Sequence, residues 1–287
     1  MSKKDVPPLI EFLKRDEWKT VGFTSRIKDN IAYKWSGRHH FVVLINDLET
    51  TGPAAIAEAI LMARNGLIVP ALSDDHAFTL DRCDRMRVLL QRYSLRLHSI
   101  MGPHSCVLKM ERLFTARPYA KIDYHLLARW LKHDNGRPVP PIPDLAVSRV
   151  GPEDAERLFS LQKAYELEEV CLDPSHFNET ISRMLFKKNL RKQVVFITEA
   201  EGLPVAKAGT NARGFNVDQI GGVFTKPGVR QKGIATFLMK VLLEHLSTER
   251  EAVTLFVKRD NIPALALYRK LQFEERGSYR IVYYNRP

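Results

Sequence analysis

The segment with the clearest chemical potential is a short loop at 230–235. It contains Arg230, Gly233 and Ala235, and it leads from an expected strand into an amphipathic helix. Glycine lets a ligand approach the backbone closely. The first turn of a helix has N–H groups without acceptors and a partial positive charge. The loop therefore predicts an anion site suited to a pyrophosphate; a plain strand-to-helix turn is the alternative.

A second segment follows after one further expected strand. It carries Asn261, Ala264, Leu267, Tyr268 and Phe273. The two segments in this order resemble the GNAT superfamily of N-acetyltransferases, whose patterns are R/Q-x-x-G-x-G/A and N-x-x-A-x-x-L-Y-x-x-x-G-F. The chain has a glutamine at position 272, where the second pattern has glycine. The resemblance covers nearly all of residues 143–287.

The resemblance implies acetyl-CoA as the co-substrate. Main-chain groups of two strand residues would hold the pantetheine arm, amides of the loop would bind the pyrophosphate, and Asn261 would contact the pantetheine arm. Tyr268 would also donate a proton to the leaving thiolate, which is a useful general-acid step for a thiol. The implied cofactor-binding residues are Val223, Thr225, Arg230, Gln231, Lys232, Gly233, Ile234, Ala235, Thr236, Asn261, Ala264 and Tyr268.

The general base is not evident from the sequence. Some relatives in the superfamily place a glutamate four residues before the acetyl-binding position, where this chain has Gln219. An amide cannot take a proton, so we expect Gln219 to orient a water or the acceptor. Asp218 is adjacent, but strand alternation points it to the opposite face. Direct attack needs no covalent enzyme intermediate, and Cys171 is therefore not expected to be a nucleophile.

Acceptor contacts are expected at the end of the first helix of the C-terminal half. Tyr165, Glu168 and Glu169 lie there, and a carboxylate could hold an acceptor that carries an ammonium group. A solvated acidic helix end is an equally good interpretation.

The C-terminal half predicts a mixed α/β fold. Its expected order is a strand, two helices, three strands, a helix, a strand, a helix and one or two final strands. The first helix begins at Pro152 and the second covers 174–188. The helix after the loop has apolar residues at helical spacing, namely Ile234, Phe237, Leu238, Val241, Leu242 and Leu246.

Four prolines within 138–143 predict an extended connector. The expected domains are therefore 1–134, a linker at 135–143, and 144–287. Strands are expected at 40–45, 67–71, 96–101 and 121–128, with helices at 80–93 and from Gly102 onward. This order echoes part of a GNAT fold. It lacks the anion loop, which favours a degenerate GNAT-like domain that shapes the acceptor site, a layout similar to that of glycine N-acyltransferase-like proteins.

Composition limits the other possibilities. The net charge of +11 is spread over both halves without a polybasic arm, so no nucleic-acid partner is expected. No apolar run has the length of a membrane-spanning helix, and the sequence predicts a cytoplasmic protein without a membrane partner. The three cysteines, at 83, 106 and 171, lack the spacing of a zinc or disulfide framework, and no metal is expected.

The function predicted is acetyl transfer from acetyl-CoA to a primary amine of a small molecule or amino acid. The alternatives are an acetyltransferase acting on protein N-termini or lysines, and a non-catalytic acyl-CoA sensor. The absence of the glutamate is compatible with a sensor, whereas Tyr268 argues against one. A homodimer is compatible with all three.

Overall fold

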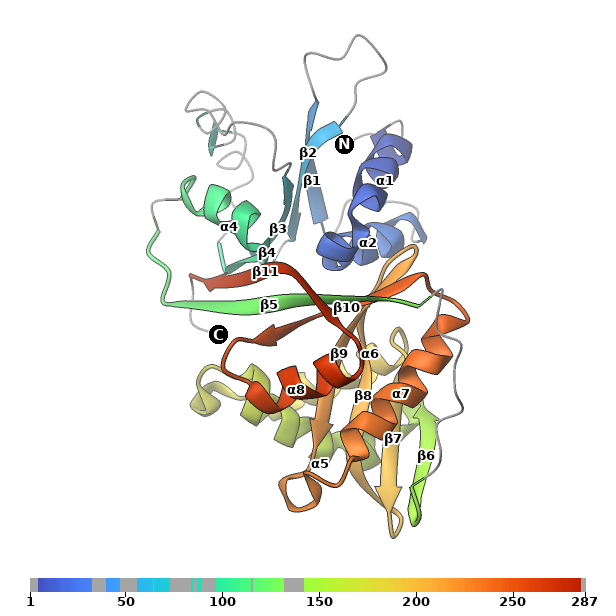
Figure 1. Ribbon diagram of the computed structural model, residues 1–287. Coiled ribbons are helices and arrows are strands. Elements are labelled where there is room, and N and C mark those ends of the chain that lie inside the picture. Colours follow the sequence, from blue (N-terminus) through green and yellow to red (C-terminus); the bar gives the residue numbers. More distant parts are fainter. Residues whose placement is uncertain are drawn as a thin grey trace. The chain divides into compact units, whose positions relative to one another are not determined.

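The computed structural model describes residues 5–32, 40–46, 56–63, 65–72, 84, 87–88, 97–114, 116–131 and 142–284. The chain forms two compact units. The first consists of Met1–Leu127, Phe256–Ile262 and Glu275–Pro287, and the second of Ala128–Leu255 and Pro263–Glu274. Residues near the C-terminus thus belong to the same unit as the N-terminal residues (Figure 1).

The first unit is built on a mixed sheet. Its strands are β1 (His40–Asn46), β2 (Ile56–Ala63), β3 (Leu67–Leu72), β4 (Ser99–Pro103), β5 (Ala120–Trp130) and β11 (Glu274–Tyr283). Their order is β1-β2-β3-β4-β11-β5. β3 and β4 are parallel, and β11 pairs with β4 in antiparallel register from Tyr279↔Pro103 to Tyr283↔Ser99.

The described part of the first unit contains α1 (Val6–Arg15), α2 (Glu17–Ala32) and α4 (His104–Glu111). Prolines occupy the first positions of α1, where a missing N–H costs nothing. Leu9 and Leu13 of α1 pack with Phe23 and Ile27 of α2 in one apolar cluster. On α4, Val107 and Met110 pack with Val282 of β11 in another. The C-terminal strand therefore contributes to this unit's core.

The strands of the second unit's part of the sheet follow the order β10-β9-β8-β7-β6. Its strands are β6 (Leu145–Val150), β7 (Val195–Ala200), β8 (Leu203–Arg213), β9 (Val217–Thr225) and β10 (Ala252–Lys258). Its α-helices are α5 (Ala155–Tyr165), α6 (Glu179–Leu190), α7 (Ile234–Ser247) and α8 (Ile262–Lys270). The predicted order of elements is confirmed, with β11 as one final strand.

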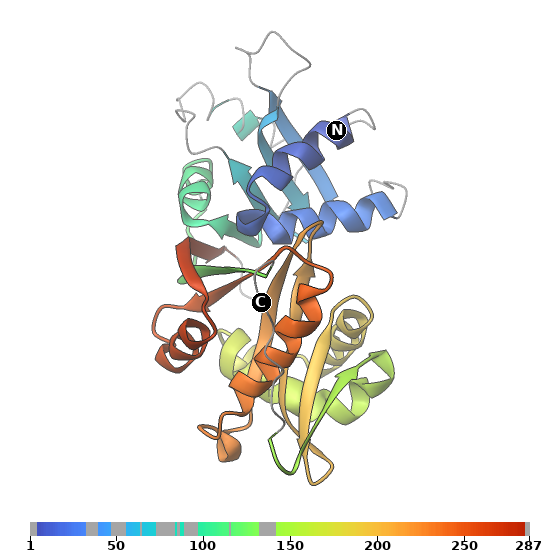
Figure 2. The same ribbon diagram turned by 45° about the vertical axis from the view of Figure 1, so that its right-hand side comes forward.

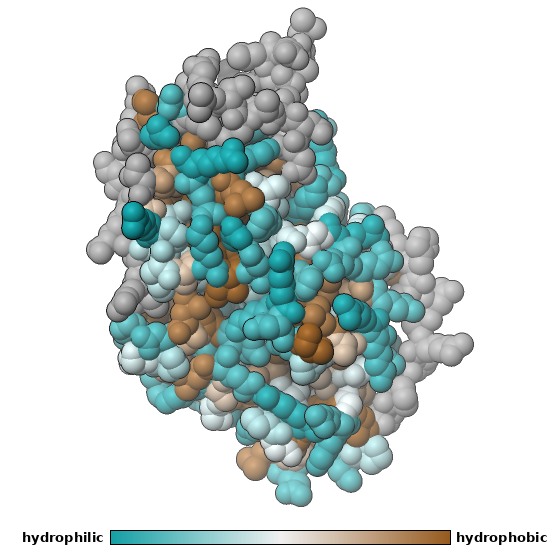
Figure 3. Space-filling view, turned by 60° about the vertical axis from the view of Figure 1, so that its left-hand side comes forward, coloured by the Kyte–Doolittle hydropathy of each residue, from teal (hydrophilic) through white to brown (hydrophobic). Residues whose placement is uncertain are grey.

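Helices cover both faces of this sheet, with α7 on one face and α5 and α6 on the other (Figures 1 and 2). Five of the six apolar residues predicted for α7 are buried, and Val241 is partly exposed. α5 and α6 pack on the sheet through Leu158, Phe186 and Ile197. The surface seen in Figure 3 is mostly hydrophilic, in keeping with the spread charge.

Some boundaries differ from the predictions. The second helix starts at Glu179, and Pro174–His176 forms a separate 3-10 turn, because Asn178 caps the helix by accepting a hydrogen bond from Ile181 N at 2.9 Å. A π-helix at Glu166–Val170 extends α5. Most of the helix expected at 80–93, Cys83 and nearly all of the connector at 135–143 lie outside the described residues. α1, α2 and β2 were not predicted.

Candidate functional site

The loop before α7 has the backbone of an open, ligand-facing turn. A short 3-10 turn at Pro227–Val229 precedes it, and Gln231 has φ 63°. Gly233 is the N-cap of α7 in the left-handed region at φ 79°, and a Cβ there would meet nothing within 4 Å. The amides of the first turn of α7 have no intrahelical acceptor. Ile234, Ala235 and Thr236 lie in that turn, so the loop and helix place their N–H groups together.

The side chain of Arg230 is held by two partners. Its Nε donates to the carbonyl of Thr225 at 2.9 Å, and one terminal nitrogen contacts both oxygens of Glu168 at 2.7 and 2.9 Å. Both side chains are 41% exposed, so the pair contributes little to stability. The structure thus places Glu168, predicted as an acceptor contact, in an ion pair with Arg230. Lys232 is exposed.

β9 carries a bulge next to Val223, the position expected to face the acetyl group. Gly222 lies in the left-handed region at φ 64°, and the register with β8 shifts between Lys207 and Gly209. On the other edge, the described ladder with β10 pairs Val217 to Gln219 and ends there, while β9 continues to Thr225. Val223 and Thr225 therefore lie on a part of β9 beyond this ladder, as an added pantetheine strand would require.

Tyr268 is buried on α8. Its side chain is 8% exposed and its ring packs edge-on against Phe273 at a centroid distance of 5.7 Å. Burial raises the pKa of the Tyr268 hydroxyl, and Tyr165 and Glu169 raise it further by electrostatic repulsion of the phenolate. The hydroxyl therefore keeps its proton at neutral pH. Tyr165 at the end of α5 and Glu169 of the following π-helix are thus near enough to Tyr268 to affect its hydroxyl.

The π-helix that follows α5 contains the acidic residues Glu166, Glu168 and Glu169. Its ring closes with a hydrogen bond from Cys171 N to the Glu166 carbonyl at 2.8 Å, and such helices are frequent at functional sites. Tyr165 precedes it and packs against Phe224 of β9 at 6.1 Å. Burial raises the pKa of Tyr165 to about 12. Burial also raises the pKa of the Cys171 thiol, which is unsuited to a thiolate nucleophile.

Lys207 is a buried lysine beside these residues that the sequence analysis did not single out. It lies on β8 and is 6% exposed. Its Nζ donates to the Gly222 carbonyl at 3.1 Å and lies 4.0 Å from the centroid of the Tyr165 ring. Burial lowers the pKa of Lys207 to about 7, and the charge of Glu166 opposes this shift. Only a lysine flanked by small apolar residues, Ala206 and Ala208, hinted at such burial.

The two residues considered for base chemistry occupy different environments. Asp218 is fully buried; its carboxylate accepts a hydrogen bond from Arg213 at 2.9 Å and forms an ion pair with Arg250 at 2.8 Å. It is therefore engaged by two arginines. Gln219 is 6% exposed and pairs with Thr254 on β10 and Ala212 on β8. Its role in orienting water or the acceptor stays a prediction.

The remaining predicted residues are at the start of α8. Asn261 directly precedes the helix, and its N–H donates to the Lys258 carbonyl at 3.1 Å. Ala264 lies in the first turn. Within the described ranges, no three His, Cys, Asp or Glu residues form a metal-binding group. No helix of the described part is long and apolar enough to cross a membrane.

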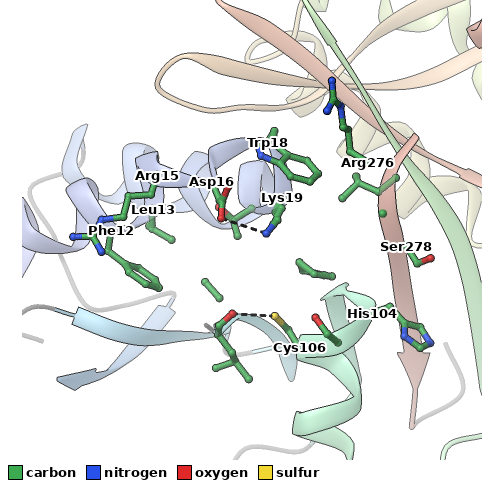
Figure 4. Close-up of a pocket in the computed structure, with 17 residues that line it drawn as sticks. Phe12, Leu13, Arg15, Asp16, Trp18, Lys19, His104, Cys106, Arg276 and Ser278 are labelled. Carbon is green, nitrogen blue, oxygen red and sulfur yellow. Dashed lines mark hydrogen bonds and ion pairs between the residues drawn. The ribbon is translucent and has the colours of Figure 1, made fainter. Parts of the chain in front are cut away.

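Two cavities have different characters. In the second unit, one of about 210 Å³ is lined by residues that include Tyr165, Lys207, Gly221 and Gly222. A larger cavity of about 620 Å³ lies in the first unit (Figure 4). There Lys19 and Asp16 form an ion pair at 3.3 Å. We assign the chemistry to the second unit, because the anion loop, the bulge and the buried tyrosine belong to it.

Comparison with known proteins agrees with this geometry. Residues 158–273 match the model of the acetyltransferase (GNAT) family. They form a GNAT-family domain. No curated protein matches the chain by sequence.

Solved structures extend the likeness to the whole chain. A Drosophila protein from structural genomics is 12% identical, with a TM-score of 0.68, and the match covers 99% of this chain and 97% of that one. A tandem GNAT protein from the clavulanic acid biosynthesis pathway is 12% identical, with a TM-score of 0.57 and coverages of 98% and 94%. A GCN5-related N-acetyltransferase from Kribbella flavida is 15% identical, with a TM-score of 0.55 and coverages of 92% and 96%. At these identities the likeness shows the fold: a GNAT fold in the C-terminal half, with a divergent N-terminal part.

Proposed function

We propose that the GNAT domain transfers an acetyl group from acetyl-CoA to a primary amine of a small molecule or amino acid by direct attack. The family match over 158–273 carries this proposal. The open amides before α7 support it, because they suit the diphosphate of the carrier. Acetyl-CoA supplies the thioester carbon that the amine attacks.

The chain's own residues would divide the work as follows. Amides of residues 231–236 bind the diphosphate, with Lys232 adding positive charge. Main-chain groups of Val223 and Thr225 align the pantetheine arm, and Asn261 contacts it. Tyr268 donates its proton to the sulfur as the thiolate leaves. Since burial raises the pKa of Tyr268, the donor is present throughout the neutral range.

A small acceptor is favoured over a protein. The cavity beside Tyr165 and Gly222 measures about 210 Å³, which is below the usual size of a drug-sized ligand site. Its lining includes the polar side chains of Gln162, Glu166 and Asn211. A small ammonium compound fits such a lining.

Turnover against a panel of amines tests the proposal. The panel is glycine, lysine, spermidine, phenethylamine and a peptide with a free N-terminus, and the readout is release of the CoA thiol. Wild type should acetylate at least one small amine. Tyr268→Phe should lose about 10²-fold or more in kcat, because general-acid help contributes roughly 10² to 10⁴. Tyr119→Phe, an exposed tyrosine of the first unit, is the matched control and should retain activity.

The opposite results are equally clear. Calorimetry that shows tight acetyl-CoA binding without turnover of any amine, and with Tyr268→Phe unchanged, would indicate a sensor. Absence of acetyl-CoA binding would overturn the assignment of the loop at 230–236.

A further inference from the structure

Lys207 occupies a position that a surface lysine does not. Its side chain is almost entirely removed from solvent, yet Lys207 lines the same cavity as Tyr165 and Gly222. One N–H donates to the Gly222 carbonyl at 3.1 Å. Gly222 forms the bulge of β9 and directly precedes Val223, where the resemblance places the acetyl group. The amine of Lys207 therefore lies at the reacting end of the proposed site.

The protonation state of Lys207 follows from its surroundings. Burial lowers the pKa to about 7, and the negative charge of Glu166 opposes the shift. An ordinary lysine, with a pKa of about 10.4, is almost wholly charged at neutral pH. A large fraction of Lys207 is neutral there, and its nitrogen then has a lone pair in addition to the N–H bonded to Gly222.

We propose that Lys207 is the proton acceptor of the reaction, taking a proton from the ammonium group of the acceptor so that the free amine can attack acetyl-CoA. This inference rests on the proposed function. Lys207 would thus remove the proton that Gln219 cannot accept, because an amide is not a base. Asp218 is unsuited to this step because its carboxylate is bound by Arg213 and Arg250.

The proton balance closes with the groups present. The N–H bond of the acceptor ammonium breaks, and the proton moves to Nζ of Lys207. The amine attacks the thioester carbon, the C–S bond breaks, and Tyr268 gives its proton to the thiolate. The phenolate then recovers the second proton from the new amide nitrogen. Lys207 releases its proton to solvent, so one proton leaves per ammonium consumed.

The ammonium formed on Lys207 has three stabilising neighbours. The ring face of Tyr165, 4.0 Å away, attracts a cation, and the Gly222 carbonyl accepts its hydrogen bond. Glu166 provides the counter-charge. Its carboxylate is fixed by Gln162 Nε2 and Ser182 Oγ, each at 2.6 Å. The site can therefore host both forms of the lysine, which a base requires.

The pH profile of kcat/KM tests this role, measured with the fastest small amine of the panel. For wild type, activity should rise with pH through an apparent pKa near 7, because the base must lose its proton first. Lys207→Met should lose about 10²-fold at pH 7, and its rise should move towards the pKa of the free amine. With hydroxylamine as the acceptor, Lys207→Met should lose far less activity, because this amine is neutral at pH 7 and needs no deprotonation.

Two variants separate a base from a structural cation. Lys207→Arg keeps a positive charge but cannot deprotonate, so it should be as impaired as Lys207→Met. Lys187→Met, at an exposed position of α6, should behave as wild type. Calorimetry should give the same acetyl-CoA affinity for wild type and Lys207→Met.

Several outcomes would contradict the role of Lys207 as the proton acceptor. An unchanged pH limb in Lys207→Met, recovery in Lys207→Arg, or lost acetyl-CoA binding in Lys207→Met would overturn it while the proposed function stands. Stoichiometric acetylation of Lys207 seen by mass spectrometry would also overturn it, because the lysine would then be an acceptor. Wild type that acetylates no amine removes the proposed function itself, and this inference with it.

Discussion

Asp218 is a buried carboxylate whose ion pairs favour a role in stability. Its carboxylate is fully buried and meets Arg213 and Arg250. Removing one partner of a buried ion pair leaves the others uncompensated and costs roughly 3 to 5 kcal/mol. Asp218→Asn should lower the free energy of unfolding by about this amount in urea titrations.

The control for this prediction is a second carboxylate that contacts the same arginine. Glu249 also contacts Arg213, at 2.7 Å, but is 44% exposed. Glu249→Gln should change the free energy of unfolding by less than about 1 kcal/mol, because exposed pairs contribute little. Equal losses in the two variants would show that the buried carboxylate is not the stabilising partner.

Candidate residues could be selected from the sequence where a motif carried them. Gly233 and Tyr268 were selected because both lie within patterns of fixed spacing. Lys207 escaped because one lysine in an alternating strand normally points to solvent, and its burial depends on Tyr165 and Glu166, which are remote in sequence. The pairing of Glu168 with Arg230 is likewise a product of the fold.

At the scale of elements, the bulge of β9 brings the backbone of Gly222 into contact with Lys207, the proposed base. A Cβ on Gly222 would lie 2.9 Å from Nζ of Lys207, and the residue has φ 64°. Gly222→Ala should therefore lower stability by roughly 1 kcal/mol through backbone strain and also displace the lysine. Activity should fall, and the pH limb near 7 should shift.

Gly202 offers a matched comparison. It has φ 74° in the turn between β7 and β8, and a Cβ there meets nothing within 4 Å. Gly202→Ala should show the same loss of stability in urea but keep the activity and its pH limb. Similar activity in both variants would mean that displacing the lysine is without effect.

Elements were predictable in proportion to their local signals. The order of the second unit follows from alternating periodicities, and α7 from its apolar face. β2 was missed because Ala57, Glu58, Leu61 and Met62 are typical of helices. The π-helix after α5 has no sequence pattern of its own.

At the scale of the molecule, the first unit depends on a strand that is distant in sequence. Val282 of β11 is fully buried in a cluster with Ile60, Met62 and Ile100. Val282→Ala should cost about 2 kcal/mol. Hydrogen exchange should accelerate in β3 and β4 more than in β8. Val147→Ala, at a 38% exposed position of β6, should leave both patterns unchanged; faster exchange confined to β8 would refute the shared core.

The position of β11 also bears on synthesis. β4 and β5 emerge from the ribosome long before residues 274–283 are translated. Until then the sheet of the first unit lacks β11, the strand that pairs between β4 and β5. Unpaired strand edges invite aggregation. Chaperone demand during translation should therefore fall on the N-terminal segment, and ribosome-bound chains stalled before residue 274 should remain protease-sensitive there.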